Sequence, residues 1–223
     1  MYISTDAIVL KNINFKESSI ISRIFTYEYG KISIIIKGAK KSKNNITSIV
    51  ESGNIVDCTF YNGKSSLKNI KEICCKKVHN QTRINLLSYY FSMAIIAILD
   101  KSIHENQQLK NLYNLSIHSL DSINRNIIDL DIIFIHFLIH LIHHLGFNIL
   151  DTSNINQNDI IENIEMLNIC NDLNSINSIP LHLINKIKII LYKHMKNHII
   201  DLHDIQAIHM IKKIKNEKSI RSN

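Results

Sequence analysis

The sequence predicts an α+β protein in which a small, basic, closed β-barrel is followed by an all-helical domain. Short β-branched and aromatic runs fill residues 1–80, and helical periodicity replaces them afterwards. The charge changes at the same place. Residues 1–80 hold 13 Lys and Arg against 6 Asp and Glu, whereas residues 81–223 hold 13 of each. We therefore predict two domains, 1–80 and 81–223, with the boundary near residues 79–83.

Five short strands are expected in the first domain. Turn signals at Tyr29-Gly30 and Asn62-Gly63 separate runs that are rich in Ile, Val, Thr, Phe and Tyr. The expected strands cover residues 7–10, 19–26, 31–36, 54–61 and 67–78. So small an open sheet would leave both of its edges exposed, and a closed five-stranded barrel avoids this.

The second domain shows apolar residues at helical spacing. We expect helices over residues 86–98, 106–123, 127–145 and 205–215, a short one near 158–167, and a long one from Pro180 to about 200, with Ser178 as its cap. Residues 148–178 are rich in Asn, Asp and Ser and are interpreted as a linker region. The residues from 216 onward are expected to fray.

The abundance of Lys in the chain is not by itself evidence of nucleic-acid binding. The chain holds 48 Ile, 27 Asn and 22 Lys but only 4 Arg, a bias typical of an A/T-rich genome. Such a bias would spread Lys evenly, yet the whole net charge of +7 lies in residues 1–80. A basic N-terminal module indicates a polyanionic partner, either nucleic acid or an anionic membrane.

Several function classes find no support. The four Cys form no Cys-x-x-Cys, so neither a zinc site nor a disulfide framework is expected, and reduced thiols indicate the cytoplasm. The N-terminus has no signal-peptide pattern. Glycine-rich phosphate loops and nucleophile motifs are absent from the sequence, which favours a non-enzymatic protein without a cofactor.

One apolar stretch, residues 132–150, is long enough to reach across a bilayer. However, Asp129, His136, His140 and His143 fall on one stripe of a helix, which favours a core helix with a polar seam. A metal-dependent hydrolase that uses these His residues and a membrane-surface protein are kept as alternatives.

The densest basic cluster is Lys37-Gly-Ala-Lys-Lys-Ser-Lys43, at the end of an expected strand. Such a loop can follow a phosphate backbone, and nearby Lys11, Lys16, Arg23 and Lys31 could extend the surface. Aromatic residues are interleaved with these cations and could stack on bases or belong to the core: Phe15, Phe25, Tyr27, Tyr29, Phe60 and Tyr61.

The helix after Pro180 carries a second basic group. An apolar stripe at Ile184, Ile187, Leu191 and Met195 should face the core. On the other side, Lys186, Lys193 and Lys196 surround Ile189. This surface could receive an acidic peptide that ends in a hydrophobic residue, or it could be an ordinary solvated face.

The order of motifs in the first domain resembles the RecO family of recombination mediators. The series runs Ala7-Ile-Val-Leu10, Phe15-Lys-Glu-Ser-Ser19, Ile24-Phe25-Thr26, Gly30-Lys31 and Lys37-Gly-Ala-Lys-Lys41. A weaker similarity continues through residues 141–147, which end in Leu145-Gly-Phe147, and through residues 191–214.

The resemblance implies an N-terminal OB-fold, a helical C-terminal domain, and a non-enzymatic cytoplasmic role, near the nucleoid, in homologous-recombination repair and the SOS response. Family members bind single- and double-stranded DNA and anneal complementary strands. With RecR they load RecA onto strands covered by single-stranded-DNA-binding protein, whose acidic C-terminal tail they dock. By position, the DNA contacts would be Arg23, Lys31, Lys37, Lys40, Lys41 and Lys43.

The sequence departs from the family pattern in two places. Residues 148–178 contain only Cys170, so this is a short form in which the family's zinc-binding Cys cluster is expected to be absent. After the basic loop, Ser48-Ile-Val-Glu51 replaces the usual Leu-x-Pro. The rival interpretation is an OB-fold RNA-binding or ribosome-associated factor, which would prefer structured RNA to single-stranded DNA.

Overall fold

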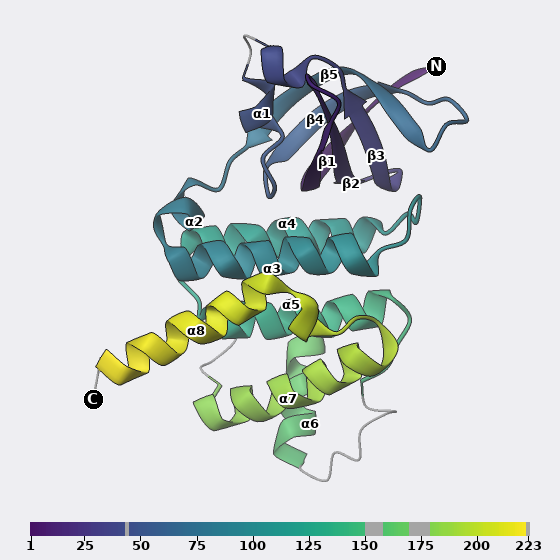
Figure 1. Ribbon diagram of the computed structural model, residues 1–223. Helices are drawn as coiled ribbons and strands as arrows, with labels where there is room; N and C mark the ends of the chain where they lie inside the picture. Colours follow the sequence, from purple (N-terminus) through teal and green to yellow (C-terminus); the bar gives the residue numbers. More distant parts are fainter. Residues whose placement is uncertain (43–44, 150–157, 170–178, 222–223) are drawn as a thin grey trace. The chain divides into compact units, whose positions relative to one another are not determined.

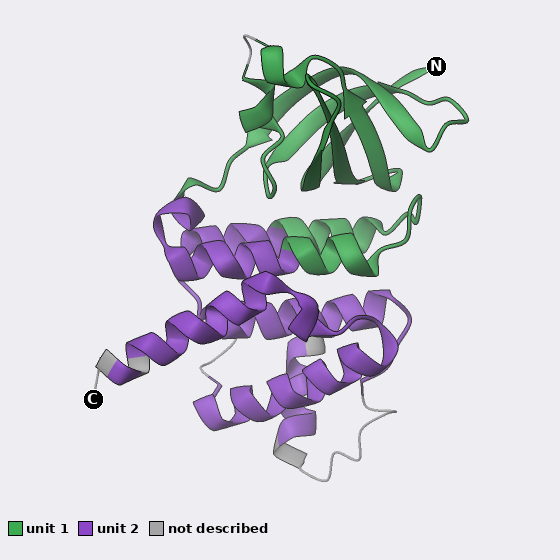
Figure 2. Ribbon diagram, viewed as in Figure 1, with its two compact units in different colours: residues 1–80, 96–117 green, residues 81–95, 118–223 purple. Residues whose placement is uncertain are grey.

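The computed structural model describes residues 1–42, 45–149, 158–169 and 179–221. Strands come first along the chain and helices follow, which confirms the α+β prediction (Figure 1). The contacts divide the chain into two compact units (Figure 2). The first contains residues 1–80 and 96–117, and the second contains residues 81–95 and 118–223. The division into domains at residue 80 stays a prediction.

The predicted five-stranded closed barrel is confirmed. Its strands run in the order β1-β2-β3-β5-β4 around the barrel. β3 and β5 are parallel, and the other neighbouring pairs are antiparallel. The strands are β1 (Tyr2–Phe15), β2 (Ser19–Thr26), β3 (Gly30–Ile36), β4 (Ile55–Tyr61) and β5 (Leu67–Lys77). β1 extends well beyond the expected residues 7–10.

Alternation along the strands builds the barrel core. Side chains at every second position point inward, so short apolar residues recur there at a period of two. The buried set is Ala7, Val9, Ile20, Ile24, Ile32, Ile34, Ile36, Val56, Cys58 and Phe60. Closure of the sheet covers this set on all sides without a second layer of strands.

Two short helical turns link β3 to β4, and periodicity did not predict them. They are η1 (Ala39–Lys41) and α1 (Ile46–Ile49). Both are too short for a 3.6-residue repeat to appear in the sequence. The Asn54 side chain donates to the carbonyl oxygens of Ser48 and Ile49, at 2.8 and 3.1 Å, and so holds the end of α1.

A helical segment, residues 96–117, packs within the barrel unit. It comprises the end of α3 (Leu86–Ser102), a loop, and the start of α4 (Lys110–Arg125). Gly30 adopts φ 69°, and a Cβ there would lie 2.1 Å from the Gln107 carbonyl oxygen. The Asn106 amide donates to the Lys31 carbonyl oxygen at 2.9 Å. Glycine is therefore required at this turn for both its backbone angle and its lack of a side chain.

The second unit is helical. Its central helix is α5 (Leu130–His144), against which α6 (Asn158–Ile169) and α7 (Leu181–His198) pack. The short α2 (Asn80–Ile84), which starts at the last residue of the first unit, and η3 (Leu202–Asp204) were not predicted. α8 spans Gln206–Arg221, so the expected fraying is wrong for residues 216–221. Pro180 is the N-cap of α7, and Ser178 lies outside the described residues.

The polar residues predicted on one stripe of α5 occupy different environments in the structure. Asp129 is the N-cap, and its carboxylate accepts from the Asp131 amide at 2.7 Å. His136 is 2% exposed, whereas His143 is exposed. Across the described part of the chain, no group of three or more His, Cys, Asp and Glu could hold a metal ion. None of the described helices is long and apolar enough to cross a membrane.

Candidate nucleic-acid interface

The basic loop after β3 is a tight turn that turns its Lys side chains outward. Gly38 has φ 70°, and the Lys41 amide donates to its carbonyl oxygen at 3.0 Å. Ala39 is buried, while Lys37, Lys40 and Lys41 are exposed. The buried Ala39 fixes the turn to the barrel and leaves the three ammonium groups in solvent. We call these three residues the lysine loop.

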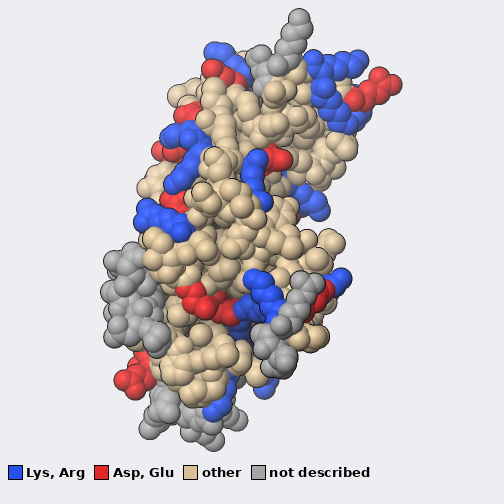
Figure 3. Space-filling model, turned by 90° about the vertical axis from the view of Figure 1, so that its left-hand side faces the viewer, with Lys and Arg blue, Asp and Glu red and all other residues tan. Residues whose placement is uncertain are grey.

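The turn between β1 and β2 lies beside the lysine loop. The Lys40 amide donates to the Ser18 carbonyl oxygen at 3.0 Å, so the two turns are in contact. This turn brings the exposed Lys16, whose Nζ lies 5.5 Å from the centre of the Phe15 ring. Figure 3 shows Lys and Arg side chains on one face of the barrel, with carboxylates scattered among them. Lys43 lies outside the described residues.

Arg23 and Lys31 do not join the lysine loop; both contact Asp100 within the barrel unit. The Arg23 guanidinium lies 2.5 Å from the Asp100 carboxylate, and the Lys31 ammonium donates to the Asp100 carbonyl oxygen at 2.7 Å. Burial lowers the pKa of Lys31, although the negative charge of Asp100 opposes this shift. Both cations therefore hold residues 96–117 against β2 and β3.

The aromatic residues of the barrel separate into core and surface. Phe25 and Phe60 are fully buried. Tyr27 packs edge-on against Tyr113, and Tyr29 packs edge-on against Phe60. Tyr61 differs from these because it is 47% exposed. The sequence pattern alone could not make this distinction, since all of these residues lie on or beside strands.

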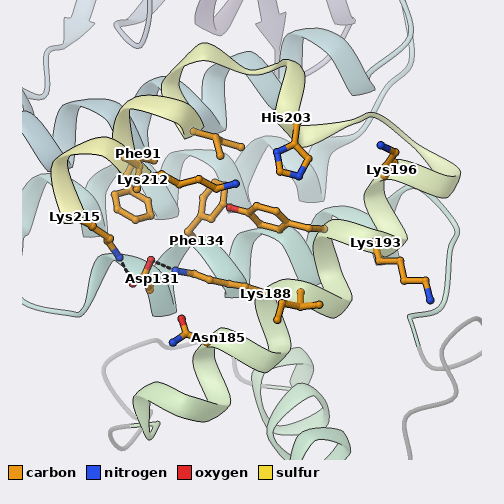
Figure 4. Close-up of a pocket in the computed structure, with 14 residues that line it drawn as sticks. Phe91, Asp131, Phe134, Asn185, Lys188, Lys193, Lys196, His203, Lys212 and Lys215 are labelled. Atoms are coloured by element: carbon orange, nitrogen blue, oxygen red, sulfur yellow. Dashed lines mark hydrogen bonds and ion pairs between the residues drawn. The ribbon is translucent and has the colours of Figure 1, made fainter. Parts of the chain in front are cut away.

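A pocket of about 660 Å³ opens in the helical unit between α5, α7 and α8 (Figure 4). Ile189, Lys193 and Lys196 line it, whereas Lys186 of the same predicted surface is not among its lining residues. Apolar side chains from three helices, α3, α5 and α8, add to the lining, namely Phe91, Phe134, Ile208 and Ile211. Three further cations also line it: Lys188, Lys212 and Lys215.

The carboxylate of Asp131 lies at one end of this pocket and pairs with Lys188 and Lys215 (Figure 4). Its side chain is only 8% exposed. Burial alone would raise the pKa of Asp131, but the two ammonium groups hold it below its ordinary value. Lys196 instead pairs with Asp201 at 2.8 Å, away from Asp131. The pocket thus combines an apolar interior with a surplus of positive charge.

The family comparison identifies the two parts of the chain separately. Residues 1–78 match the family described as "Recombination protein O N terminal", and residues 83–156 match "Recombination protein O C terminal". Together these matches cover more than half of the chain. The chain belongs to the RecO family. The RecO resemblance predicted from the motif order is thereby confirmed.

Individual relatives agree with the family. The chain is 41% identical over 71 residues to the DNA repair protein RecO of Pelodictyon phaeoclathratiforme, covering 32% of this chain and 26% of that protein. Its identity to the DNA repair protein RecO of Prosthecochloris aestuarii is 24% over 148 residues, or 66% of this chain and 56% of the relative. The chain is 27% identical over 145 residues to the DNA repair protein RecO of Thermoanaerobacter sp., covering 65% of this chain and 58% of that protein. The matched regions therefore span little more than half of these RecO proteins at most.

Two features of these candidate sites could not be found from sequence spacing. Asp131, Lys188 and Lys215 belong to three different helices, α5, α7 and α8. Only the tertiary fold brings the two ammonium groups to the carboxylate. The pairing of Arg23 with Asp100 joins residues 77 positions apart. Cys170, on which the expected absence of zinc depends, lies outside the described residues.

Proposed function

We propose that this RecO protein is a non-enzymatic recombination mediator that binds single- and double-stranded DNA and anneals complementary strands. The observation that carries the proposal is the exposed lysine loop on a barrel that holds the whole net positive charge of the chain. Lys ammonium groups neutralise phosphates and release the counterions condensed on them. Two strands held in this way repel each other less, so they pair faster without any bond chemistry.

The lysine loop and Lys16 are proposed as the phosphate contacts, with Lys43 beside them in the sequence. Arg23 and Lys31 are assigned a supporting part, because their cationic groups are already engaged with Asp100. Loss of either should therefore weaken DNA binding by loosening the barrel unit. In line with the family resemblance, we propose RecR as a partner and RecA loading as the outcome.

Changing Lys37, Lys40 and Lys41 together to Ala should weaken binding to a single-stranded oligonucleotide about 10- to 100-fold near 0.1 M salt. The slope of log affinity against log salt should become shallower by about 2, because each single-strand phosphate contact contributes about 0.7. Fluorescence anisotropy over a salt series measures both quantities.

The control for this experiment removes the same charge from the helical unit. Lys186, Lys213 and Lys218 are exposed, and changing all three to Ala should leave single-strand affinity close to that of the unchanged protein. Equal affinities for the lysine-loop variant and the unchanged protein would rule out this loop as the phosphate contact.

The α5–α7–α8 pocket is proposed as the docking site for the acidic C-terminal tail of single-stranded-DNA-binding protein. Its apolar interior fits a terminal hydrophobic side chain, and its lining keeps a surplus of positive charge for the acidic residues that precede it, although Lys188 and Lys215 pair with Asp131 and Lys196 with Asp201. Ile189, which is 69% exposed and lines the pocket, adds apolar contact. The tail would bring the mediator to covered strands.

Lys193→Glu should weaken binding of a synthetic tail peptide about tenfold, because it places a negative charge beside the peptide carboxylates. Lys186→Glu makes the same charge change on the same helix outside the pocket lining and should have little effect. Isothermal titration calorimetry measures the affinity of each variant for the peptide. Equal losses in both variants would place the tail elsewhere.

Competition decides between this proposal and the RNA-binding alternative. Labelled single-stranded DNA is bound first, and unlabelled DNA or a structured RNA of equal length is added. The proposal predicts that DNA competes at least as well as RNA. Efficient displacement by RNA alone would favour the alternative.

A further inference from the structure

We propose that Tyr2, Tyr61 and Lys71 form a stacking platform on the outside of the barrel that takes the unpaired bases of a single strand. This inference rests on the proposed single-strand binding and adds to it a contact with bases. The lysine loop contacts phosphates, which single strands and duplexes share. A base-stacking site gives a means of telling the two apart.

The two tyrosines are neighbours on adjacent strands. Tyr2 of β1 is paired in register with Tyr61 of β4, so both side chains project from the same face of the sheet. Their ring centres are 5.6 Å apart, with the planes inclined at 70°. They are 55% and 47% exposed, whereas the other aromatic rings of the described barrel strands are more covered.

Local backbone features hold the Tyr61 ring in place. A Cβ at Gly63 would lie 3.0 Å from the Tyr61 ring, so glycine there lets the ring lie close to the chain. The Lys68 ammonium donates to the Gly63 carbonyl oxygen at 2.7 Å and fixes the loop that follows β4. A ring that is already oriented loses less conformational entropy when a base stacks on it.

Lys71 supplies positive charge at the platform because of a bulge in β5. Thr59 of β4 pairs with Glu72, and the next residue, Phe60, pairs with Ile70, which leaves Lys71 as the extra residue. Bulges redirect side chains, and the Lys71 ammonium lies 5.0 Å from the centre of the Tyr2 ring. A base that stacks here would therefore have a cation near its phosphate.

A hollow of about 550 Å³ lies between Lys71 of the platform and Lys37 of the lysine loop, and Glu72 also lines it. Lys71 and Lys37 both line it, and Ile46, Ile49 and Ile70 form part of its apolar wall. A strand whose phosphates lie on the loop can thus continue past Lys37 to Lys71 and the tyrosines. The hollow joins Lys37 to Lys71, and its two Lys outnumber its one carboxylate, Glu72, which is why we assign the surface to single-stranded nucleic acid.

The test compares an oligothymidine with an abasic strand of the same length, which has identical phosphates and no bases. The unchanged protein should bind the oligothymidine about 30-fold more tightly, because each of two stacked bases contributes at the lower end of the measured range. Tyr2→Ala with Tyr61→Ala should abolish this preference and leave abasic-strand and duplex affinities unchanged.

Two controls make the result specific. Tyr2→Phe with Tyr61→Phe keeps both rings and should keep the preference. Tyr89→Ala removes an exposed ring from α3 and should not alter it. Circular dichroism of the double Ala variant checks that the barrel is folded.

Failure of the platform is distinguishable from failure of the proposed function. If the unchanged protein binds oligothymidine and the abasic strand equally, or if the double Ala variant retains the preference, the platform is wrong. The lysine-loop variant should lose affinity for both strands and keep their ratio. Absence of binding to either strand by the unchanged protein would overturn both proposals.

Discussion

Replacing Asp131 with Ala should lower the free energy of unfolding by about 3 kcal/mol, the lower end of the range for removing one partner of a buried ion pair. The carboxylate neutralises Lys188 and Lys215 from a position that is only 8% exposed. Without it, the ammonium groups of Lys188 and Lys215 lose the carboxylate that they share. Chemical denaturation at neutral pH measures the loss.

The same carboxylate predicts a pH dependence. Its pKa in the folded protein lies below the ordinary value of 3.8, so its contribution is fully present above that pH. The contribution is lost as the pH falls through the folded pKa. The stability difference between the unchanged protein and the Ala variant should therefore be constant near neutral pH and shrink below about pH 4.

A double variant separates loss of the charge pair from loss of packing. Asp131→Leu with Lys188→Met replaces the buried pair by apolar side chains, which is often close to neutral. Lys215 can turn to solvent, since its side chain is 36% exposed. We expect this variant to recover most of the stability, and a loss as large as that of Asp131→Ala would contradict the electrostatic explanation.

Asp100→Ala should be the second-largest change, with a loss of about 2–3 kcal/mol in unfolding free energy. The Asp100 side chain is 10% exposed and pairs with Arg23, which is 29% exposed, so part of the effect is screened. The backbone contact from Lys31 to the Asp100 carbonyl oxygen remains in the variant. Thermal unfolding followed by circular dichroism reports the change.

Lys101→Ala is the matched control for this change, because Lys101 is an exposed neighbour on the same helix. Its expected effect on stability is under about 0.5 kcal/mol. Arg23→Ala should lower the free energy of unfolding by about as much as Asp100→Ala does. If Arg23→Ala instead left stability unchanged and reduced DNA affinity as strongly as the lysine-loop variant, Arg23 would be a direct phosphate contact.

The barrel could be predicted from sequence because its strands have a period of two and are separated by recognisable turns. Ser19–Thr26 matches the expectation residue for residue, and β1 was cut short because polar Lys11, Asn12 and Asn14 interrupt its second half. The helices α3 to α8 could be predicted from apolar spacing. The turns η1 and α1 could not, because each is shorter than two helical turns.

The site was less predictable than the fold. Charge segregation and the Lys37–Lys41 motif located the basic loop, since both are properties of neighbouring residues. Exposure of Tyr2 and Tyr61 depends on which face of a closed sheet each residue meets, and the convergence on Asp131 depends on helix packing. Such long-range placements leave no local signal in an Ile-rich chain.

The most direct test of this account is an annealing assay with two complementary oligonucleotides coated with the cognate single-stranded-DNA-binding protein. The account predicts that the unchanged protein accelerates pairing and that the acceleration falls as salt rises. The variant with Lys37, Lys40 and Lys41 changed to Ala should lose most of it. Pairing that is no faster with the unchanged protein than without it, or equally fast with the variant, would contradict the account.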